Sequence, residues 1–374
     1  MPAARRSRRT GGRAVTSLPT FGEYFTALWG YSPFPWQEML AKRVAKGRWP
    51  GALDLPTASG KTACIDVAIW ALAYQADKPL AKRTAPRRIW FVVDRRIVVD
   101  EAFERAQKVS AKLKEATGGP LEAVAGRLLA VGGTSQPLAV ARLRGGILRD
   151  DGWARLPSQP AVITSTVDQL GSRLLFRGYG RSHLTAPIFA GLAAHDSLIL
   201  LDEAHCSVPF LQTLRCVERY RGRDWAEEPI ETPFAFSILS ATPPSDLRPE
   251  SVFPGAERER ALGHPVLDAR MRASKPAELV PPLKAKNSST VDAFVEAAVN
   301  RACEFVNDGN KKRVAVIVNR VRTAIGIATT LKDRLEESAD TVLLTGRLRP
   351  YERDRLVERW KPFLRADEPD DPDR

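Results

Sequence analysis

The stretch LDLPTASGKTACIDVAIWAL, residues 53–72, decides the fold. Its pattern predicts a short apolar strand, a tight loop that ends in Gly60-Lys61-Thr62, and then a helix. Backbone N–H groups in such a loop, with a helix N-terminus behind them, form a cradle for anions. In a loop of this kind the lysine, here Lys61, reaches the β- and γ-phosphates of a nucleotide, and the threonine, here Thr62, binds Mg²⁺ through its hydroxyl.

The loop departs from the full G-x-x-x-x-G-K-[ST] pattern in one place, because Leu55 stands where that pattern has glycine. The variant P-T-x-x-G-K-T, which this chain matches, occurs in many helicases. Gly60 permits the turn and a close approach of phosphate. The residues expected to hold ATP are Pro56, Thr57, Ala58, Ser59, Gly60, Lys61 and Thr62.

A second motif, SLILLDEAH, occupies residues 197–205. An apolar strand delivers Asp202 and Glu203 at its carboxyl end, and phosphate hydrolysis needs one carboxylate for Mg²⁺ and another group to orient water. We expect Asp202 to bind Mg²⁺ with Thr62, and Glu203 to orient the water. His205 is expected to contact the next motif and to link hydrolysis to nucleic acid. The predicted catalytic residues are therefore Lys61, Asp202, Glu203 and His205.

The third motif is ILSATPP, residues 238–244, in which Ser240 and Thr242 end another apolar strand. In isolation this pattern is only a strand followed by a turn that a hydroxyl stabilises. In the order GKT, DEAH, SAT it becomes specific, and Ser240 and Thr242 are expected to couple the domains.

The rest of the chain alternates apolar strands with helical patterns, which predicts an α/β fold with a parallel sheet between helices. In such sheets ligands bind at the carboxyl ends of the strands. The expected strands are 89–94, 127–133, 161–168, 197–204 and 236–244, and the expected helices between them include 63–76 and 97–116.

We predict four regions along the chain. A disordered basic tail covers 1–19, and a complete ATP-binding domain covers 20–262. A linker at 263–284 belongs to an irregular, Pro-rich stretch from 243 to 282. A partial second domain at 285–374 has a helix at 291–308 and strands at 313–319 and 341–346.

The chain has 374 residues, a formal charge of +13 and a pI of about 9.8, which favours a polyanionic partner such as nucleic acid. It has no apolar run of about 20 residues and no secretory signal, so we expect a cytoplasmic protein without membrane contact. The four cysteines form no C-x-x-C pair, and we expect them to be buried rather than bound to zinc.

The ordered PTASGKT, DEAH and SAT motifs resemble those of superfamily 2 helicases, whose ATP-binding domains are RecA-like. Further stretches resemble the helicase component of type I CRISPR interference over roughly residues 20 to 360: PFPWQEML, FVVDRRIVVDEA, LRGG, TSTVDQLGSRLLFRGYG, VAVIVNRVRTA and LLTGRLRPYERD. This resemblance implies ATP and Mg²⁺ as cofactors and 3′-to-5′ translocation on single-stranded DNA. It also implies two partners, a CRISPR surveillance complex and an HD nuclease domain or subunit.

The resemblance implies roles for further residues. Gln37 would read the adenine edge, and Tyr31 or Phe34 would stack near the base. Contacts to the nucleic-acid strand would come from Arg95, Arg96, Gly145, Gly146, Thr166, Gln169, Asn319, Thr345, Gly346 and Arg347.

The resemblance also predicts a Q-x-x-G-R-x-x-R motif with arginine fingers, which does not occur after Arg347. We therefore expect a truncated chain that binds ATP·Mg²⁺ and hydrolyses it slowly. The dipeptide His195-Asp196 is expected to be a turn rather than a nuclease metal site. Two alternatives stay open: another superfamily 2 enzyme, such as a DEAH RNA helicase or a restriction translocase, and a non-catalytic remnant that binds ATP or DNA.

Overall fold

The computed structural model divides the chain into two compact units, Met1–Ser274 and Lys275–Arg374. It describes residues 18–132, 135–146, 151–180, 182–229, 231–244, 246–274, 276–280, 290–309, 313–336 and 338–364. Nearly all of the predicted basic tail at 1–19 lies outside the described residues, as does the acidic end from residue 365. Each unit is described by itself below.

Unit 1 contains a seven-stranded, fully parallel sheet with strand order β3-β4-β2-β5-β6-β1-β7. This confirms the predicted α/β, RecA-like fold class. The first strand of the chain lies between the last two, so the loop that follows it is next to the end of β6. The strands are β1 (Ala52–Asp54), β2 (Arg88–Val93), β3 (Ala139–Leu143), β4 (Ala161–Thr166), β5 (Ser197–Asp202), β6 (Phe234–Ser240) and β7 (Val252–Phe253).

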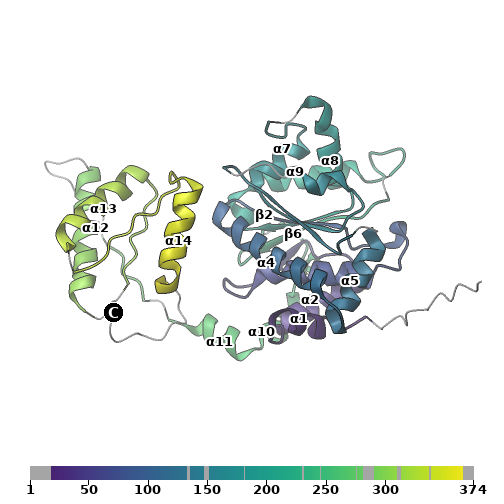
Figure 1. Cartoon of the computed structure of the whole chain (residues 1–374), viewed down its shortest axis with the longest axis horizontal. Coiled ribbons are helices and arrows are strands. Elements are labelled where there is room, and N and C mark those ends of the chain that lie inside the picture. The colour runs from purple at the N-terminus through teal and green to yellow at the C-terminus, as the bar shows by residue number, and fades with distance from the viewer. Residues whose placement is uncertain are drawn as a thin grey trace, which may run out of the picture. The chain divides into compact units, whose positions relative to one another are not determined.

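Helices cover both faces of the sheet (Figure 1). In β2, Ile89, Phe91 and Val93 face one core, while Trp90 and Val92 face the other, as the two-residue period of a strand requires. The first core receives α1 (Phe21–Trp29), α2 (Pro35–Lys46), α3 (Cys64–Tyr74), α4 (Arg96–Glu115) and α5 (Gly119–Gly132). The second receives α6 (Gly152–Arg155), α7 (Val167–Leu174), α8 (Ala186–Ala194) and α9 (Val208–Tyr220).

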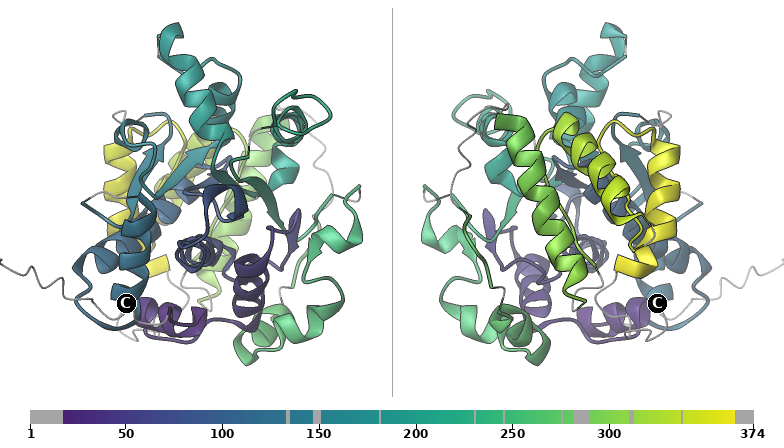
Figure 2. Two further views of the ribbon diagram at one scale, coloured as in Figure 1. Left: turned by 90° about the vertical axis from the view of Figure 1, so that its right-hand side faces the viewer. Right: turned by 90° about the vertical axis from the view of Figure 1, so that its left-hand side faces the viewer.

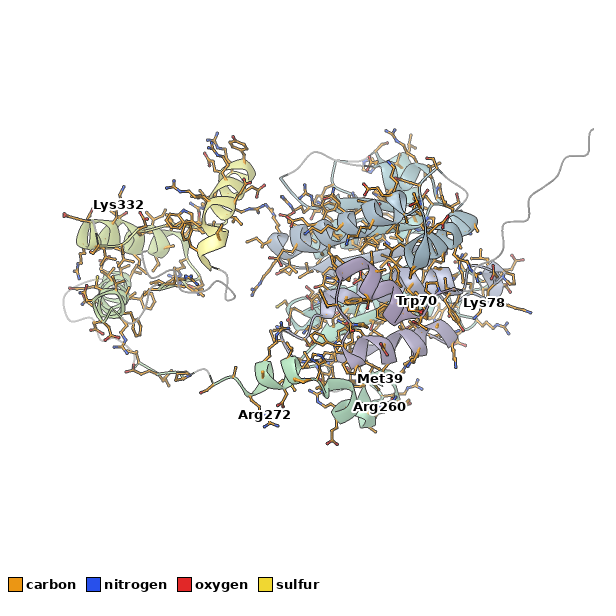
Figure 3. All side chains as sticks on the ribbon, turned by 60° about the horizontal axis from the view of Figure 1, so that its bottom comes forward. Met39, Trp70, Lys78, Arg260, Arg272 and Lys332 are labelled. Carbon is orange, nitrogen blue, oxygen red and sulfur yellow. The ribbon has the colours of Figure 1, made fainter. Side chains whose placement is uncertain are left out.

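Helix α1 shows how local sequence sets its bounds. The Thr20 hydroxyl accepts a hydrogen bond from the Glu23 N–H at 3.3 Å, and the Glu23 carboxylate accepts one from the Thr20 N–H at 2.7 Å. The helix ends at Gly30, whose φ of 80° suits glycine. Phe21 packs edge-on against Trp70 of α3, with 5.9 Å between the rings, which joins the first helix to the one behind the GKT loop (Figure 3).

Two expectations for unit 1 are wrong. The predicted strand at 127–133 is helical as far as Gly132, as part of α5. Leu121, Val124 and Leu128 recur at helical spacing, so the apolar run packs as one face of a helix. The sheet position goes instead to β3. Of the cysteines, only Cys64 is fully buried, and Cys206 and Cys216 are exposed.

The described part of the Pro-rich stretch is more ordered than expected. Beyond β7 it contains α10 (Arg258–Leu262) and α11 (Pro265–Arg272), and both belong to unit 1. Leu262 and Leu267 are buried in the first core, and these two apolar anchors hold the helices against the domain.

The dipeptide His195-Asp196 lies where α8 turns into β5, at the amino edge of the sheet. The buried Asp196 carboxylate accepts hydrogen bonds from the Arg83 guanidinium at 2.8 and 2.9 Å and from the Arg87 N–H at 3.0 Å. Burial and the nearby charges of Arg221 and Arg88 lower the pKa of His195. Asp196 is therefore neutralised by arginine, and among the described residues no group of three His, Cys, Asp or Glu could hold a metal ion.

Unit 2 contains three described helices, α12 (Thr290–Asn307), α13 (Val321–Leu335) and α14 (Pro350–Leu364). Helices α12 and α13 share a small core that includes Val299, Ile327 and Leu331. The strands predicted at 313–319 and 341–346 are not formed, because their described residues pair with no other strand. Within the described residues of both units, no helix is long and apolar enough to cross a membrane.

Candidate nucleotide and nucleic-acid site

The loop after β1 has the backbone of an anion cradle. Ala58 and Gly60 both have positive φ, at 60° and 79°, and Ser59 lies between them. Such alternation turns successive N–H groups toward one side. The chain then enters a short 3-10 turn, Lys61–Ala63, that leads into α3. Gly60 suits its conformation, whereas Ala58 is strained there because it carries a Cβ.

Two side chains hold this loop from outside. The Trp36 indole N–H donates to the Ser59 carbonyl at 3.0 Å, and the Arg270 guanidinium of α11 donates to the Ala58 carbonyl at 2.8 Å. A trans peptide is planar, so the N–H that follows each carbonyl points the opposite way. The Ser59 and Gly60 N–H groups therefore face away from Arg270 and Trp36. The sequence motifs gave no sign of Arg270, because it lies more than 200 residues from the loop and belongs to no motif.

The carboxyl ends of β5, β6 and β1 lie side by side and are here called the β1 half of the edge. Asp202 and Leu53 both pair with Leu239 of β6, so Asp202 and the start of the GKT loop are separated by two strand spacings, about 10 Å. Lys61 lies across its loop, with its amine 3.5 Å from the Leu55 carbonyl. Lys61, Thr62 and Asp202 are thus at the same edge of one sheet.

Electrostatics links Asp202 to Lys61. Burial raises the pKa of Asp202, the Lys61 charge acts in the opposite direction, and the neighbouring Glu203 raises the pKa further. Its Oδ1 atom is buried and has no hydrogen-bond partner among the described residues. A divalent cation would give this oxygen a partner and favour the ionised carboxylate, so Asp202 fits the magnesium-binding role.

Glu203 and His205 lie just beyond Asp202 and are partly exposed. Glu203 has a φ of 51°, and its N–H donates to the Leu239 carbonyl at 3.1 Å. The His205 ring nitrogen is 3.3 Å from the Glu203 carboxylate. On β6, the Thr242 N–H donates to the Ser240 hydroxyl at 3.0 Å, which makes the SAT segment a hydroxyl-stabilised turn beside them.

Gln37 and Phe34 line the loop on its other side. A Cβ placed on Gly60 would lie 3.4 Å from the Gln37 amide nitrogen and 3.7 Å from the Phe34 ring. The Gln37 carbonyl oxygen accepts the Phe34 N–H at 2.9 Å, which leaves its amide nitrogen facing Gly60. His264, from the start of α11, packs edge-on against Phe34 with 4.9 Å between the rings. Tyr31 is exposed and packs on Phe25.

The ends of β2, β4 and β3 form the other part of the edge, here called the β3 half. Val93 pairs with Thr166, and Leu143 pairs with Ser165, so the segments that follow these strands are neighbours. This brings together most of the positions expected to contact nucleic acid: Arg95, Arg96, Gly145, Gly146, Thr166 and Gln169. Thr166 is largely buried, so only a small part of it can touch a ligand.

The arginines of the β3 half fall into two groups. Arg142 and Arg144 both bind Asp100, at 2.9 and 2.6 Å, and are neutralised by it. Arg95 and Arg96 are exposed, and neither forms an ion pair with a described residue. The Arg96 guanidinium lies so close to Gly145 that a Cβ there would be 3.1 Å from it. The missing side chain of Gly145 therefore gives room to the cation.

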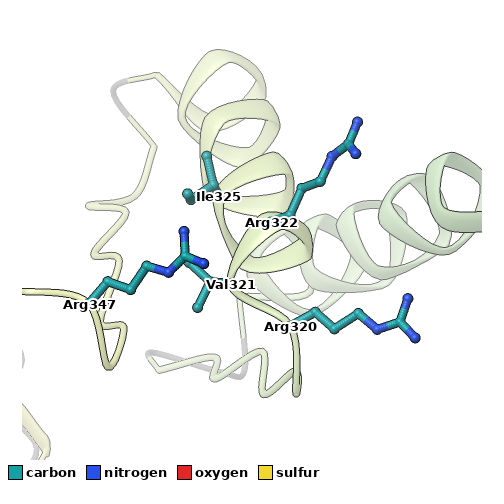
Figure 4. A pocket seen from close by; sticks show the side chains of 5 residues that line it. All are labelled: Arg320, Val321, Arg322, Ile325 and Arg347. Atoms are coloured by element: carbon teal, nitrogen blue, oxygen red, sulfur yellow. The ribbon is translucent and has the colours of Figure 1, made fainter.

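The remaining predicted positions, Asn319, Thr345, Gly346 and Arg347, lie in unit 2. An open pocket of about 550 Å³ there is lined by Arg320, Val321, Arg322, Ile325 and Arg347. Figure 4 shows the three arginines around it. Asn319 directly precedes this pocket, and Thr345 and Gly346 lie in the turn before Arg347. Unit 2 thus gathers its predicted positions around three arginines.

Comparison with solved structures shows the relationship of the fold. Mycobacterium smegmatis helicase Lhr, bound to ssDNA and AMP-PNP, matches 92% of this chain with a TM-score of 0.50 and 18% identity. The chain has a helicase fold. It spans only 40% of the Lhr chain.

Two further helicase structures are similar to a lesser degree. An S. cerevisiae Dbp5 variant bound to RNA and ADP BeF3 covers 94% of this chain and 73% of its own, with 15% identity and a TM-score of 0.45. The Pyrococcus furiosus Hef helicase domain covers 82% and 54%, with 15% identity and a TM-score of 0.32. No protein-family model and no curated protein matches the chain.

Proposed function

We propose that this chain is the ATP-binding part of a superfamily 2 helicase that couples ATP hydrolysis to movement along single-stranded DNA. The observation that carries the proposal is the placement of Lys61, Thr62 and Asp202 at one edge of one sheet. There the Lys61 charge acts on a carboxyl group whose buried oxygen has no partner.

Each residue of the β1 half has a distinct part in this proposal. The Ser59 and Gly60 N–H groups and the Lys61 amine bind the phosphates. Mg²⁺, held by Asp202 and Thr62, would neutralise charge on the transferred phosphoryl group. Glu203 orients the attacking water, and His205, within reach of its carboxylate, passes the state of the site toward the SAT turn.

The β3 half binds the strand through its phosphates. Arg95 and Arg96 supply exposed charge, and Gly146, with a φ of 82°, lets its backbone approach a phosphate closely. These contacts do not depend on base sequence and weaken as salt rises. In unit 2, Arg347 and its neighbours form a second cationic group for the same strand.

The finer role that we propose is CRISPR antiviral defence, with a surveillance complex and an HD nuclease as partners. It rests on the sequence stretches that resemble the helicase of type I interference. A pull-down with a reconstituted surveillance complex on target DNA tests it. Capture of the full chain by DNA-bound complex, but not by DNA alone, is the expected result.

The central test measures binding of a fluorescent ATP analogue and single-strand-stimulated ATPase activity on the full chain. We expect binding that requires Mg²⁺, and slow hydrolysis that oligothymidylate accelerates. Lys61→Ala should abolish both. Lys78→Ala, at an exposed lysine outside the site, is the matched control and should behave as wild type. Equal silence of wild type and Lys61→Ala in both assays would exclude the motor and favour a non-catalytic remnant.

A further inference from the structure

The segment between α7 and α8 exposes large apolar side chains at its tip. Phe176 is 59% exposed, Tyr179 55% and Leu184 88%. We call residues 175–184 the α7–α8 tip. In Figure 2 the teal ribbon of α7 and α8 stands out from the sheet of unit 1 in both views. The base of this arm is firmly packed, because Leu170, Leu174 and Phe189 belong to the second core.

Phe176 occupies a backbone position that favours glycine. The Arg177 N–H donates to the Ser172 carbonyl at 2.7 Å, and the Phe176 N–H donates to the Arg173 carbonyl at 3.1 Å. These two bonds are the Schellman pattern that ends a helix, and the residue between them takes a left-handed conformation. Phe176 has a φ of 59°, which is strained for any residue with a Cβ. Glycine would make this helix end more stable.

The tip therefore carries an aromatic ring that folding does not explain. Its ring gains little from burial, since more than half of it faces solvent. Its backbone conformation opposes any residue but glycine. A side chain that is both strained and exposed is better explained by contact with a partner.

Charge indicates the class of partner. Residues 169–195 contain no aspartate and no glutamate, whereas they contain three arginines. Arg177, next to Phe176, is exposed and forms no ion pair with a described residue. Flat rings beside unpaired cations fit single-stranded nucleic acid, whose bases stack on aromatics while its phosphates bind arginine.

The arm also begins at the β3 half. Thr166, at the end of β4, directly precedes α7, and Gln169 lies in its first turn. Eight helical residues span about 12 Å, so the tip is within a few nucleotides of the segments after β2, β4 and β3.

We propose that the α7–α8 tip is a base-stacking platform that extends the nucleic-acid track of the β3 half. Phe176 and Tyr179 stack on unpaired bases, and Arg177 binds the phosphate between them. The inference rests on the proposed function, because it needs a single strand on the β3 half.

The deciding variant is Phe176→Gly, because its two effects have opposite signs. The melting temperature should rise, since glycine relieves the strained backbone. The affinity for labelled oligothymidylate should fall about tenfold, since one stacked base is lost. ATP-analogue affinity should not change. Tyr220→Ala removes another exposed ring, 57% exposed on α9, and should leave oligothymidylate binding unchanged.

The outcomes separate this inference from the proposed function. If Phe176→Gly binds oligothymidylate like wild type while Arg96→Ala binds it more weakly, the platform is refuted and the track stands. The tip would then serve a protein partner. If wild type binds neither oligothymidylate nor oligouridylate, both proposals fail. A Phe176→Gly protein that is more stable yet binds the strand more weakly supports the platform.

Discussion

The two halves of the sheet edge differ in how their side chains are held. In the β1 half, the GKT loop is fastened from outside by Trp36 and Arg270, and the Asp202 oxygen is buried. In the β3 half, Arg95 and Arg96 are exposed and unpaired among the described residues. Binding one small ligand in one geometry requires rigid, prepositioned groups, whereas gripping any phosphate requires only accessible charge.

Asp202→Asn should break the β1 half most severely. We expect ATP turnover to fall by roughly 100-fold or more, because the carboxylate that holds the cation is lost. The folded protein should become more stable near pH 7, since burial raises the pKa of Asp202 and its ionised form opposes folding. ATPase assays and thermal unfolding measure the two effects.

The pH dependence checks the cause. A carboxyl group with a raised folded pKa destabilises the protein above that pKa, and the penalty vanishes below the unfolded value of about 3.9. The stability advantage of Asp202→Asn should therefore shrink as the pH falls from 7 toward 4. An advantage that is constant across this range would show that burial of the charge is not its origin.

Gln37→Glu should sharpen the assignment of the base-binding side. Glutamate keeps the oxygen that accepts the Phe34 N–H but replaces the amide nitrogen that faces Gly60. We expect about tenfold weaker ATP binding, the cost of one good hydrogen bond at a buried site, with an unchanged melting temperature. Gln212→Glu, at an exposed position on α9, is the control in the same titration. An equal loss in both variants would point to net charge alone.

Arg270→Ala should weaken ATP-analogue binding about fivefold, because the Ala58–Ser59 peptide loses its outer hydrogen bond and can turn. The partial rescue of this variant by Ala58→Gly is the decisive measurement, since glycine adopts positive φ without strain. Direct contact between Arg270 and phosphate would not be rescued in this way. Arg272→Ala, whose side chain pairs with Asp268, should bind ATP normally.

Arg95→Ala and Arg96→Ala should have the smallest effects, a loss of about two- to threefold each in oligothymidylate affinity at moderate salt. Each should lower the slope of log affinity against log salt by about 0.7 and leave ATP binding unchanged. Arg260→Ala, at an arginine paired with Glu257, is the control. A large loss of ATP binding in either variant would mean that the two halves are not separate sites.

The sequence predicts the β1 half well, because its motifs are local. GKT, DEAH and SAT each sit at the end of an apolar strand, and parallel strands bring such ends together. Arg270 could not be predicted, because its contact with Ala58 joins distant segments through the packing of Leu267. The strand expected at 127–133 was wrong because a short apolar run suits a helix as well as a strand.

The extended segments of unit 2 have a practical consequence. Val316 is 38% exposed, Ile317 92% and Leu344 50%, on stretches that pair with no strand among the described residues. Unpaired, apolar, extended backbone is the template onto which other chains add. The purified protein is therefore expected to self-associate as its concentration rises. Ile317→Lys is the substitution that should keep it monodisperse in light scattering.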